Sequence, residues 1–231
     1  MRSILRAQAD IYVGLKTLIF PHTCIMCSAP NKLICSDCHA IWNSRARKVN
    51  FDSVPTFSVV PYGQEVSRVV LMAKEDRNRV ARNLVAQAIT NSLLSLDKCI
   101  DVKNCLLVPI PSSKQAIKRR GESFLHPIMN RVVELLQSNE GGKISNWHWT
   151  ELLTYRRKVR DQAGLSSVER SANLKSAFRV DHYLDTPVIL VDDVVTTGAT
   201  LNNAINAFRE RKMTVLGAVT ACASAHQLLI R

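Results

Sequence analysis

Val188-Ile-Leu-Val-Asp-Asp-Val-Val-Thr-Thr-Gly-Ala-Thr200 is the stretch that decides the fold of this chain. Its first four residues are apolar and are typical of a central strand in a parallel sheet. Leu201, Ile205 and Phe208 follow at helical spacing, so the stretch predicts a strand, a turn and a helix in that order. The turn would then face a helix N-terminus, where free backbone N–H groups attract phosphate.

The polar residues of this stretch have the chemistry of a ribose 5-phosphate site. Asp192 and Asp193 can accept hydrogen bonds from two ribose hydroxyls. The turn that can surround a phosphate consists of Thr196, Thr197, Gly198, Ala199 and Thr200, in which the glycine lets the backbone approach closely. The same residue types also serve as ordinary turn and helix-cap residues, and the sequence leaves that alternative open.

A second pattern lies near the start of the chain, where four of the seven cysteines fall within fifteen residues as Cys24-x-x-Cys27 and Cys35-x-x-Cys38. Two such pairs suit one tetrahedral Zn²⁺ with four thiolate ligands, a closed and therefore structural site. A segment this short buries no core of its own, so the metal would supply its folding free energy. Disulfides are the alternative, but they need an oxidising compartment, and we see no secretory signal before Cys24.

The other three cysteines, Cys99, Cys105 and Cys222, are scattered among apolar residues. Free cysteine behaves as a small apolar residue, so we expect all three to be buried.

Length and composition fit one α/β domain with a small metal module, because 231 residues exceed one typical domain and fall short of two. We expect an amphipathic helix over residues 1–20, a four-cysteine zinc ribbon over 21–45 and an α/β domain over 51–231. No apolar run is long enough to span a bilayer, so we expect a soluble, cytoplasmic protein. The formal charge of +12 attracts phosphate polyanions such as nucleic acid.

Several segments of the α/β domain have apolar patterns that predict a strand or a helix. Residues 51–62 alternate and contain Pro55 and Pro61, which predicts short or edge strands that end at Tyr62-Gly63. Residues 79–96 have the apolar stripe of a helix, and a further helix is expected with Pro127 in its first turn.

Residues 105–111 predict a second buried strand that opens into a polar turn. Ligands bind at the carboxyl ends of such strands, so Ser112, Ser113 and Lys114 are candidates for holding a second phosphate beside the first. A plain basic loop is the equal alternative.

The segment 155–178 is predicted to be a mobile basic arm that leads into a short helix. Its candidate binding residues are Arg157, Arg160, Gln162 and Arg170. They would either close over a bound pyrophosphate or hold a nucleic-acid backbone, and a solvated surface is the third possibility.

The stretch 188–200 resembles the motif with which type I phosphoribosyltransferases bind 5-phosphoribosyl 1-pyrophosphate (PRPP). The resemblance implies that Asp192 and Asp193 contact the ribose hydroxyls and that residues 196–200 wrap the 5-phosphate. It also implies that the domain over 51–231 is a phosphoribosyltransferase-like α/β domain with a parallel central sheet.

Nearly the whole chain resembles the ComF/GntX family. The resemblance rests on the four-cysteine module, the Val108–Pro111 strand with Arg120-Gly121, the Gln162 to Phe178 arm and the PRPP motif, and Tyr62 and Lys74 fit a further family position. The order of parts is also similar to the transferase half of glutamine PRPP amidotransferases. That similarity makes residues 112–114 a pyrophosphate loop and the basic arm a flexible loop that precedes the PRPP motif.

The ComF/GntX resemblance implies a role in natural competence, in which the protein handles incoming single-stranded DNA in the cytoplasm. A basic surface would hold the strand, a PRPP-type pocket would bind sugar-phosphate groups, and other DNA-uptake or recombination proteins are possible partners. The alternative is an active Mg²⁺-dependent phosphoribosyltransferase that uses PRPP and a nitrogen nucleophile. A third reading is a zinc-ribbon adaptor whose pocket is vestigial.

Overall fold

The computed structural model describes residues 23–51, 53–100, 104–138, 147–156 and 177–228. The helices within these ranges are α2 (Ser36–Trp42), α3 (Gln64–Lys74), α4 (Arg79–Asp97), α5 (Lys114–Arg120), α6 (Leu125–Ser138) and α8 (Ala199–Glu210). The strands are β1 (Arg47–Lys48), β2 (Thr56–Tyr62), β3 (Leu106–Pro109), β4 (His148–Trp149), β5 (Leu153–Tyr155), β6 (Phe178–Val180), β7 (Val188–Val195) and β8 (Val215–Ser224).

The main sheet is almost entirely parallel, with β7 and β8 at its centre. Its strand order is β1-β2-β8-β7-β3-β4. Only β1 runs antiparallel to its neighbour, and β5 pairs with β6 in a separate antiparallel ribbon. Because parallel strands end at the same edge of a sheet, the residues after β3 and β7 meet there.

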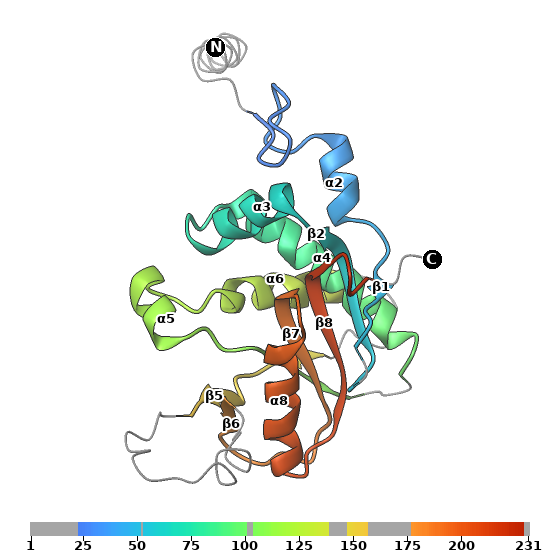
Figure 1. Cartoon of the computed structure of the whole chain (residues 1–231), viewed down its shortest axis with the longest axis vertical. Coiled ribbons are helices and arrows are strands. Elements are labelled where there is room, and N and C mark those ends of the chain that lie inside the picture. Colours follow the sequence, from blue (N-terminus) through green and yellow to red (C-terminus); the bar gives the residue numbers. More distant parts are fainter. Residues whose placement is uncertain (1–22, 52, 101–103, 139–146, 157–176, 229–231) are drawn as a thin grey trace, which may run out of the picture.

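The sheet is covered on both faces, and the period-2 alternation of β7 shows how. Ile189 and Val191 point into a core built with α3, α4 and α6, whereas Val188 and Leu190 point into a second core built with α8 and the β5–β6 ribbon. Figure 1 shows α8 on one face of the sheet and α4 and α6 on the other. The predicted α/β class with a parallel central sheet is therefore confirmed.

The four-cysteine segment packs on the larger of these cores. Cys24, Met26, Cys38 and Trp42 are buried in the same apolar cluster as α3, α4 and α6. Trp42 of α2 is fully buried, which gives this short segment an anchor in the main domain. The segment therefore shares a core with the α/β domain.

Most of the elements expected from the sequence are present. The helix over 79–96 is α4, the helix containing Pro127 is α6, the strand over 105–111 contains β3, and the strand-turn-helix of 188–200 is β7 and α8. The two aspartates belong to the strand itself, which runs to Val195.

The strand predicted within 51–62 is β2, which ends at Tyr62; β1 pairs only with its Phe57 and Ser58, so Pro61 lies beyond the end of β1, where its missing N–H costs no ladder bond. The polar turn predicted after Pro111 is present, but the sequence did not predict α5, which follows it and is capped by Ser113. One expectation was wrong. Cys99 follows the end of α4 and is exposed, whereas Cys105 and Cys222 are buried as expected.

The amphipathic helix over 1–20 and most of the basic arm lie outside the described residues. Within the described ranges, none of the helices has the length and apolar character needed to cross a membrane.

Candidate ligand site at the ends of β3 and β7

A crevice opens at the carboxyl ends of β3 and β7, which are neighbours in the sheet. The helices that follow these two strands pack on opposite faces of the sheet. The chain after β3 leads to α6 on one face, and the chain after β7 leads to α8 on the other. Such a switch point is the usual ligand site of an open parallel sheet. The cavity there has a volume of about 320 Å³, and we call it the carboxylate cavity. Its lining comprises Lys74, Ile110, Pro111, Ser112, Ser113, Arg120, Phe124, Leu125, Tyr155, Asp192, Asp193, Val194 and Thr200.

The two aspartates reach this cavity from opposite faces of β7. Asp193 continues the side of Ile189 and Val191, and Asp192 continues the side of Val188 and Leu190. Burial and the neighbouring Asp193 carboxylate raise the pKa of Asp192 well above its usual value. Ionisation of both carboxyl groups is therefore unfavourable unless a bound cation or a hydroxyl donor relieves their repulsion.

Lys74 supplies part of that relief. Its Nζ lies 2.6 Å from Oδ2 of Asp193, whose side chain is only 10% exposed. The same ammonium lies 5.3 Å from the centre of the Phe124 ring, so a cation–π contact fixes its other side. The last residue of α3 thus holds the inner carboxylate from a segment far away in the sequence.

The turn after β7 contains a glycine in a backbone conformation that other residues rarely adopt. Gly198 has φ +77°, in the left-handed region, and is the N-cap of α8. A Cβ at this position would lie 2.6 Å from the Phe51 ring, so both conformation and space require glycine. Thr196 and Thr197 are exposed, and Thr200 lines the carboxylate cavity.

The turn after β3 faces the aspartates across the cavity. The Oγ of Ser112 accepts a hydrogen bond from the backbone N–H of Phe124 at 3.3 Å, and the Oγ of Ser113 caps α5 by accepting from the N–H of Ala116 at 3.2 Å. Ser112 and Ser113 line the carboxylate cavity, while Lys114 lines the adjoining one.

Arg120 is the most buried cation of the carboxylate cavity. Its side chain is only 8% exposed, and its Nε has no hydrogen-bond partner among the described residues. Glu75 lies 3.7 Å from its Nη1, and the ring centre of Phe124 lies 5.9 Å from its Cζ. A buried guanidinium with an unused donor suits an anionic ligand.

A network of ion pairs holds Arg120 in place. The guanidinium of Arg77 donates to the backbone carbonyl of Arg120, and its Nε lies 3.3 Å from Glu122. Glu122 also accepts a hydrogen bond from Arg82 at 2.6 Å, which lowers the pKa of the carboxyl. These contacts tie the α3–α4 connection to the α5–α6 connection.

A second cavity adjoins the first and shares its wall of Ile110, Pro111, Ser112 and Tyr155. It has a volume of about 290 Å³, and we call it the Tyr155 cavity. The tyrosine ends β5 and stands between the two spaces, and burial and the nearby Asp192 raise the pKa of its hydroxyl. His126 and Glu151, whose side chains contact each other, also line this cavity.

The structure thus brings together the predicted residues Asp192, Asp193, Thr200, Ser112 and Ser113. The four candidates of the basic arm, Arg157, Arg160, Gln162 and Arg170, lie outside the described residues. Sequence reasoning missed Phe124 and Tyr155, whose apolar rings carry no local sign of a ligand. It named Lys74 and Arg120 as parts of a family resemblance.

The four cysteines converge in the segment that contains the start of α2. The Sγ atoms of Cys24, Cys27, Cys35 and Cys38 all lie within 4.8 Å of one another. Cys27 and Cys35 are separated by 3.6 Å between sulfurs, too far for a disulfide and close to the spacing of about 3.8 Å expected for two thiolates on one tetrahedral Zn²⁺. Burial opposes ionisation of Cys24, but surrounding backbone hydrogen bonds lower its pKa to about 6, which favours a thiolate ligand. The cluster can therefore hold a metal ion such as zinc.

The fold and this edge of the sheet define the class of the protein, which is an α/β protein with a phosphoribosyltransferase-like domain. Residues 116–229, from α5 to beyond β8, match the family model of the phosphoribosyl transferase domain. Among solved structures, the chain is similar to a hypoxanthine phosphoribosyltransferase from Staphylococcus aureus, with 16% identity over 63% of this chain and 67% of that one and a TM-score of 0.32. No curated protein sequence matches the chain.

Proposed function

We propose that the protein is a ComF-like competence protein that handles incoming single-stranded DNA in the cytoplasm and binds sugar-phosphate groups in a PRPP-type pocket. The observation that carries the proposal is the carboxylate cavity, in which paired aspartates, serines and buried cations surround one space. The formal charge of +12 supports a polyanionic partner.

In this proposal each side of the cavity takes one part of the ligand. Asp192 and Asp193 accept hydrogen bonds from the ribose hydroxyls, and the turn Thr196–Thr200 receives the 5-phosphate at the N-terminus of α8. Ser112 and Ser113, with Lys114 beside them, face a second phosphate, and Arg120 neutralises it. The predicted arm residues Arg157, Arg160, Gln162 and Arg170 would close over the ligand.

Two metals belong to the proposal. Zn²⁺ on the four cysteines would be structural, because four thiolates fill a tetrahedral shell and the segment is anchored to the core through Trp42. Mg²⁺ would enter with PRPP, since the carboxylate and hydroxyl oxygens of the cavity are donors that this hard cation prefers. Bound Mg²⁺ would offset the charge of the pyrophosphate group.

The pocket is tested by titrating Mg·PRPP into zinc-loaded protein in a calorimeter. We expect binding in about the micromolar range, and loss of that binding in the Asp192→Asn/Asp193→Asn variant. This variant keeps the shape of both side chains, removes their charge and replaces one acceptor oxygen of each by an NH₂ donor. Binding that is equally tight in the variant would place the ligand elsewhere and refute the pocket.

The DNA-handling part is tested separately with a labelled single-stranded oligonucleotide. Backbone contacts release counterions, so the logarithm of the affinity should fall linearly with the logarithm of the salt concentration, by about 0.7 per phosphate contacted. An affinity that does not change with salt, or no binding at low salt, would rule out this function.

An active phosphoribosyltransferase is the second candidate, and the buried Arg120 with its unused Nε favours it. A guanidinium held in a fixed, largely desolvated position would stabilise a departing pyrophosphate more than a mobile surface cation. The assay is pyrophosphate release from Mg·PRPP in the presence of a panel of nucleobases and amines. Release that is lost in Arg120→Met would support the enzyme, whereas no release with any acceptor would leave the binding function.

A further inference from the structure

Three cavities follow one another along the side of the molecule that carries the β5–β6 ribbon. The carboxylate cavity and the Tyr155 cavity share Tyr155 and the residues after β3. The Tyr155 cavity in turn shares Arg179 with a third, shallower space of about 460 Å³. We call this third space the arginine hollow, and Arg156, Arg179, Val180, Ala207, Glu210 and Arg211 line it.

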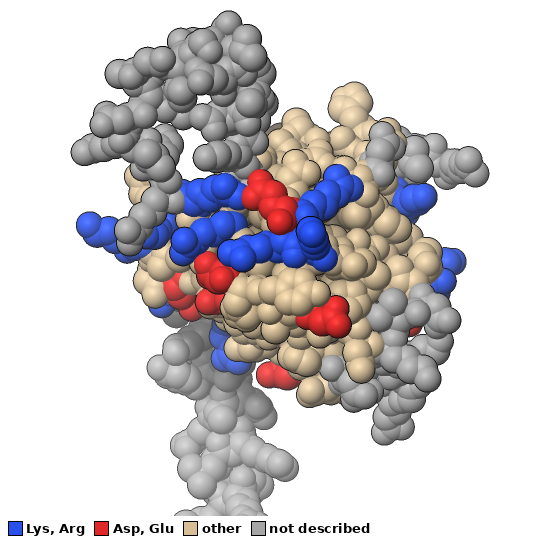
Figure 2. Space-filling view, turned by 90° about the horizontal axis from the view of Figure 1, so that it is seen from below, with Lys and Arg blue, Asp and Glu red and all other residues tan. Residues whose placement is uncertain are grey.

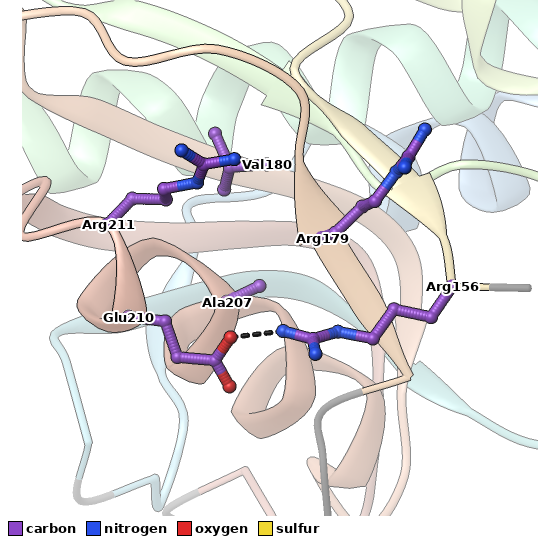
Figure 3. A pocket seen from close by; sticks show the side chains of 6 residues that line it. All are labelled: Arg156, Arg179, Val180, Ala207, Glu210 and Arg211. Carbon is purple, nitrogen blue, oxygen red and sulfur yellow. Dashed lines mark hydrogen bonds and ion pairs between the residues drawn. The ribbon is translucent and has the colours of Figure 1, made fainter.

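The arginine hollow gathers cations from three elements. Arg156 directly after β5, Arg179 of β6 and Arg211 directly after α8 line it, and Figure 3 shows that the Arg179 side chain points away from the other two. Arg156 forms an ion pair with Glu210, and Arg179 lies 3.3 Å from Asp181, while Arg211 is exposed and has no ion-pair partner among the described residues. Figure 2 shows the molecule from below the view of Figure 1, and on this face Lys and Arg side chains form a band with a few acidic groups between them.

The Tyr155 cavity has a different character, which suits a flat ring with polar edges. Part of its lining is apolar, formed by Pro109 at the end of β3, by Ile110 and Pro111 after it, and by Leu153 of β5. The Tyr155 ring is 38% exposed and rests on the buried Phe178, with ring centres 4.9 Å apart. A half-exposed ring held rigidly from behind is the kind of surface on which a base stacks.

We propose that these cavities form one track for single-stranded DNA, in which backbone phosphates lie against Arg211 and Arg179 and a base stacks on Tyr155. The next sugar-phosphate group along the strand would then reach the carboxylate cavity. The proposal rests on the DNA-handling function proposed above and adds the path that the strand follows over the surface. It assigns to Tyr155, Arg179 and Arg211 roles that their positions in the sequence do not suggest.

The combination of surfaces is what favours a nucleic-acid strand over a small anion. A phosphate or sulfate ion would need the arginine hollow alone, and the pairs of Arg156 and Arg179 with acidic groups would weaken its binding. A strand presents both phosphates and bases at regular intervals and so uses the arginines and the tyrosine together.

The test is fluorescence anisotropy of a 5′-labelled oligo(dT) strand with the zinc-loaded full chain at low salt. We expect Tyr155→Ala to weaken binding by about 5-fold to 100-fold, the range found for loss of one stacked base. Tyr155→Phe keeps the ring and should bind as the wild type does. Arg211→Ala should weaken binding and reduce the salt slope by about 0.7, because one phosphate contact is lost.

Arg131→Ala is the matched control, because it removes one exposed arginine of α6 that lies outside the three cavities. Arg211 is exposed at the end of α8, so its variant should fold even if Tyr155→Ala destabilises the β5–β6 ribbon. If the wild type binds and Arg211→Ala and Tyr155→Ala bind equally well, the strand runs elsewhere and the track is refuted. If the wild type does not bind the strand at all, the DNA-handling function fails together with the track.

Discussion

Replacing Lys74 by methionine should destabilise the protein, because it leaves Asp193 without its cation. The Nζ of Lys74 lies 2.6 Å from Oδ2 of Asp193, and the two side chains are 28% and 10% exposed. Removing one partner of a fully buried pair costs about 3–5 kcal/mol, and exposed pairs contribute about 1 kcal/mol or less. This pair is intermediate, so we expect a loss of about 2 kcal/mol in the free energy of unfolding.

For a chain of 231 residues, 1 kcal/mol corresponds to about 2–4 °C in Tm, so Lys74→Met should lower Tm by about 4–8 °C. The assay is thermal denaturation of the zinc-loaded protein at neutral pH. Lys118→Met is the control, because Lys118 is an exposed lysine of α5.

A double-mutant cycle with Asp193→Asn isolates the ion pair. In the double variant both charges are gone, so most of the stability lost in Lys74→Met should return. If the two single effects simply add, or if Lys74→Met melts at the same temperature as Lys118→Met, the ion pair does not stabilise the site and our reasoning about the carboxylates is wrong.

Three further predictions follow from the geometry. Gly198→Ala should lower the free energy of unfolding, measured by chemical denaturation, by about 2–4 kcal/mol, because the left-handed backbone and the Phe51 ring both oppose a Cβ. Adding Phe51→Leu should restore part of the loss. Wild-type stability in Gly198→Ala would contradict this reasoning. The raised pKa of Asp192 means that the folded protein binds this proton more tightly than the unfolded chain, so the wild type loses stability as pH rises from about 4 through the raised value. Asp192→Asn should therefore melt above the wild type at pH 7 and converge with it near about pH 4, and a difference that is constant over this range would refute the cause. The protein should contain one zinc ion per chain, and the Cys27→Ser/Cys35→Ser variant should contain none. In that variant tryptophan fluorescence should shift to the red as Trp42 becomes exposed. Full zinc content in the variant would exclude the four-cysteine site.

Local patterns were sufficient to predict the elements that frame the site. The apolar run before Asp192 and the spacing of Leu201 and Phe208 identify β7 and α8 because strand alternation and helical period are properties of neighbouring residues. The same reasoning missed α5, because a seven-residue helix has too short a pattern to be recognised. It failed at Cys99 because burial depends on how the end of α4 packs, which the residues around the cysteine do not encode.

The chemistry that the chain carries can be recognised from residue types and spacing alone: a carboxylate pair before a glycine turn, two pairs of cysteines, and an excess of positive charge. These features are local, and they already limit the ligands that the chain can take. The distant residues that complete the site are known only from the folded structure. Lys74 meets Asp193 because α3 packs on the face of the sheet to which Asp193 points, and Tyr155 stands beside Asp192 because the β5–β6 ribbon covers the opposite face. The side of the sheet on which each connection packs is set by burial summed over the whole core, so no single segment contains that information.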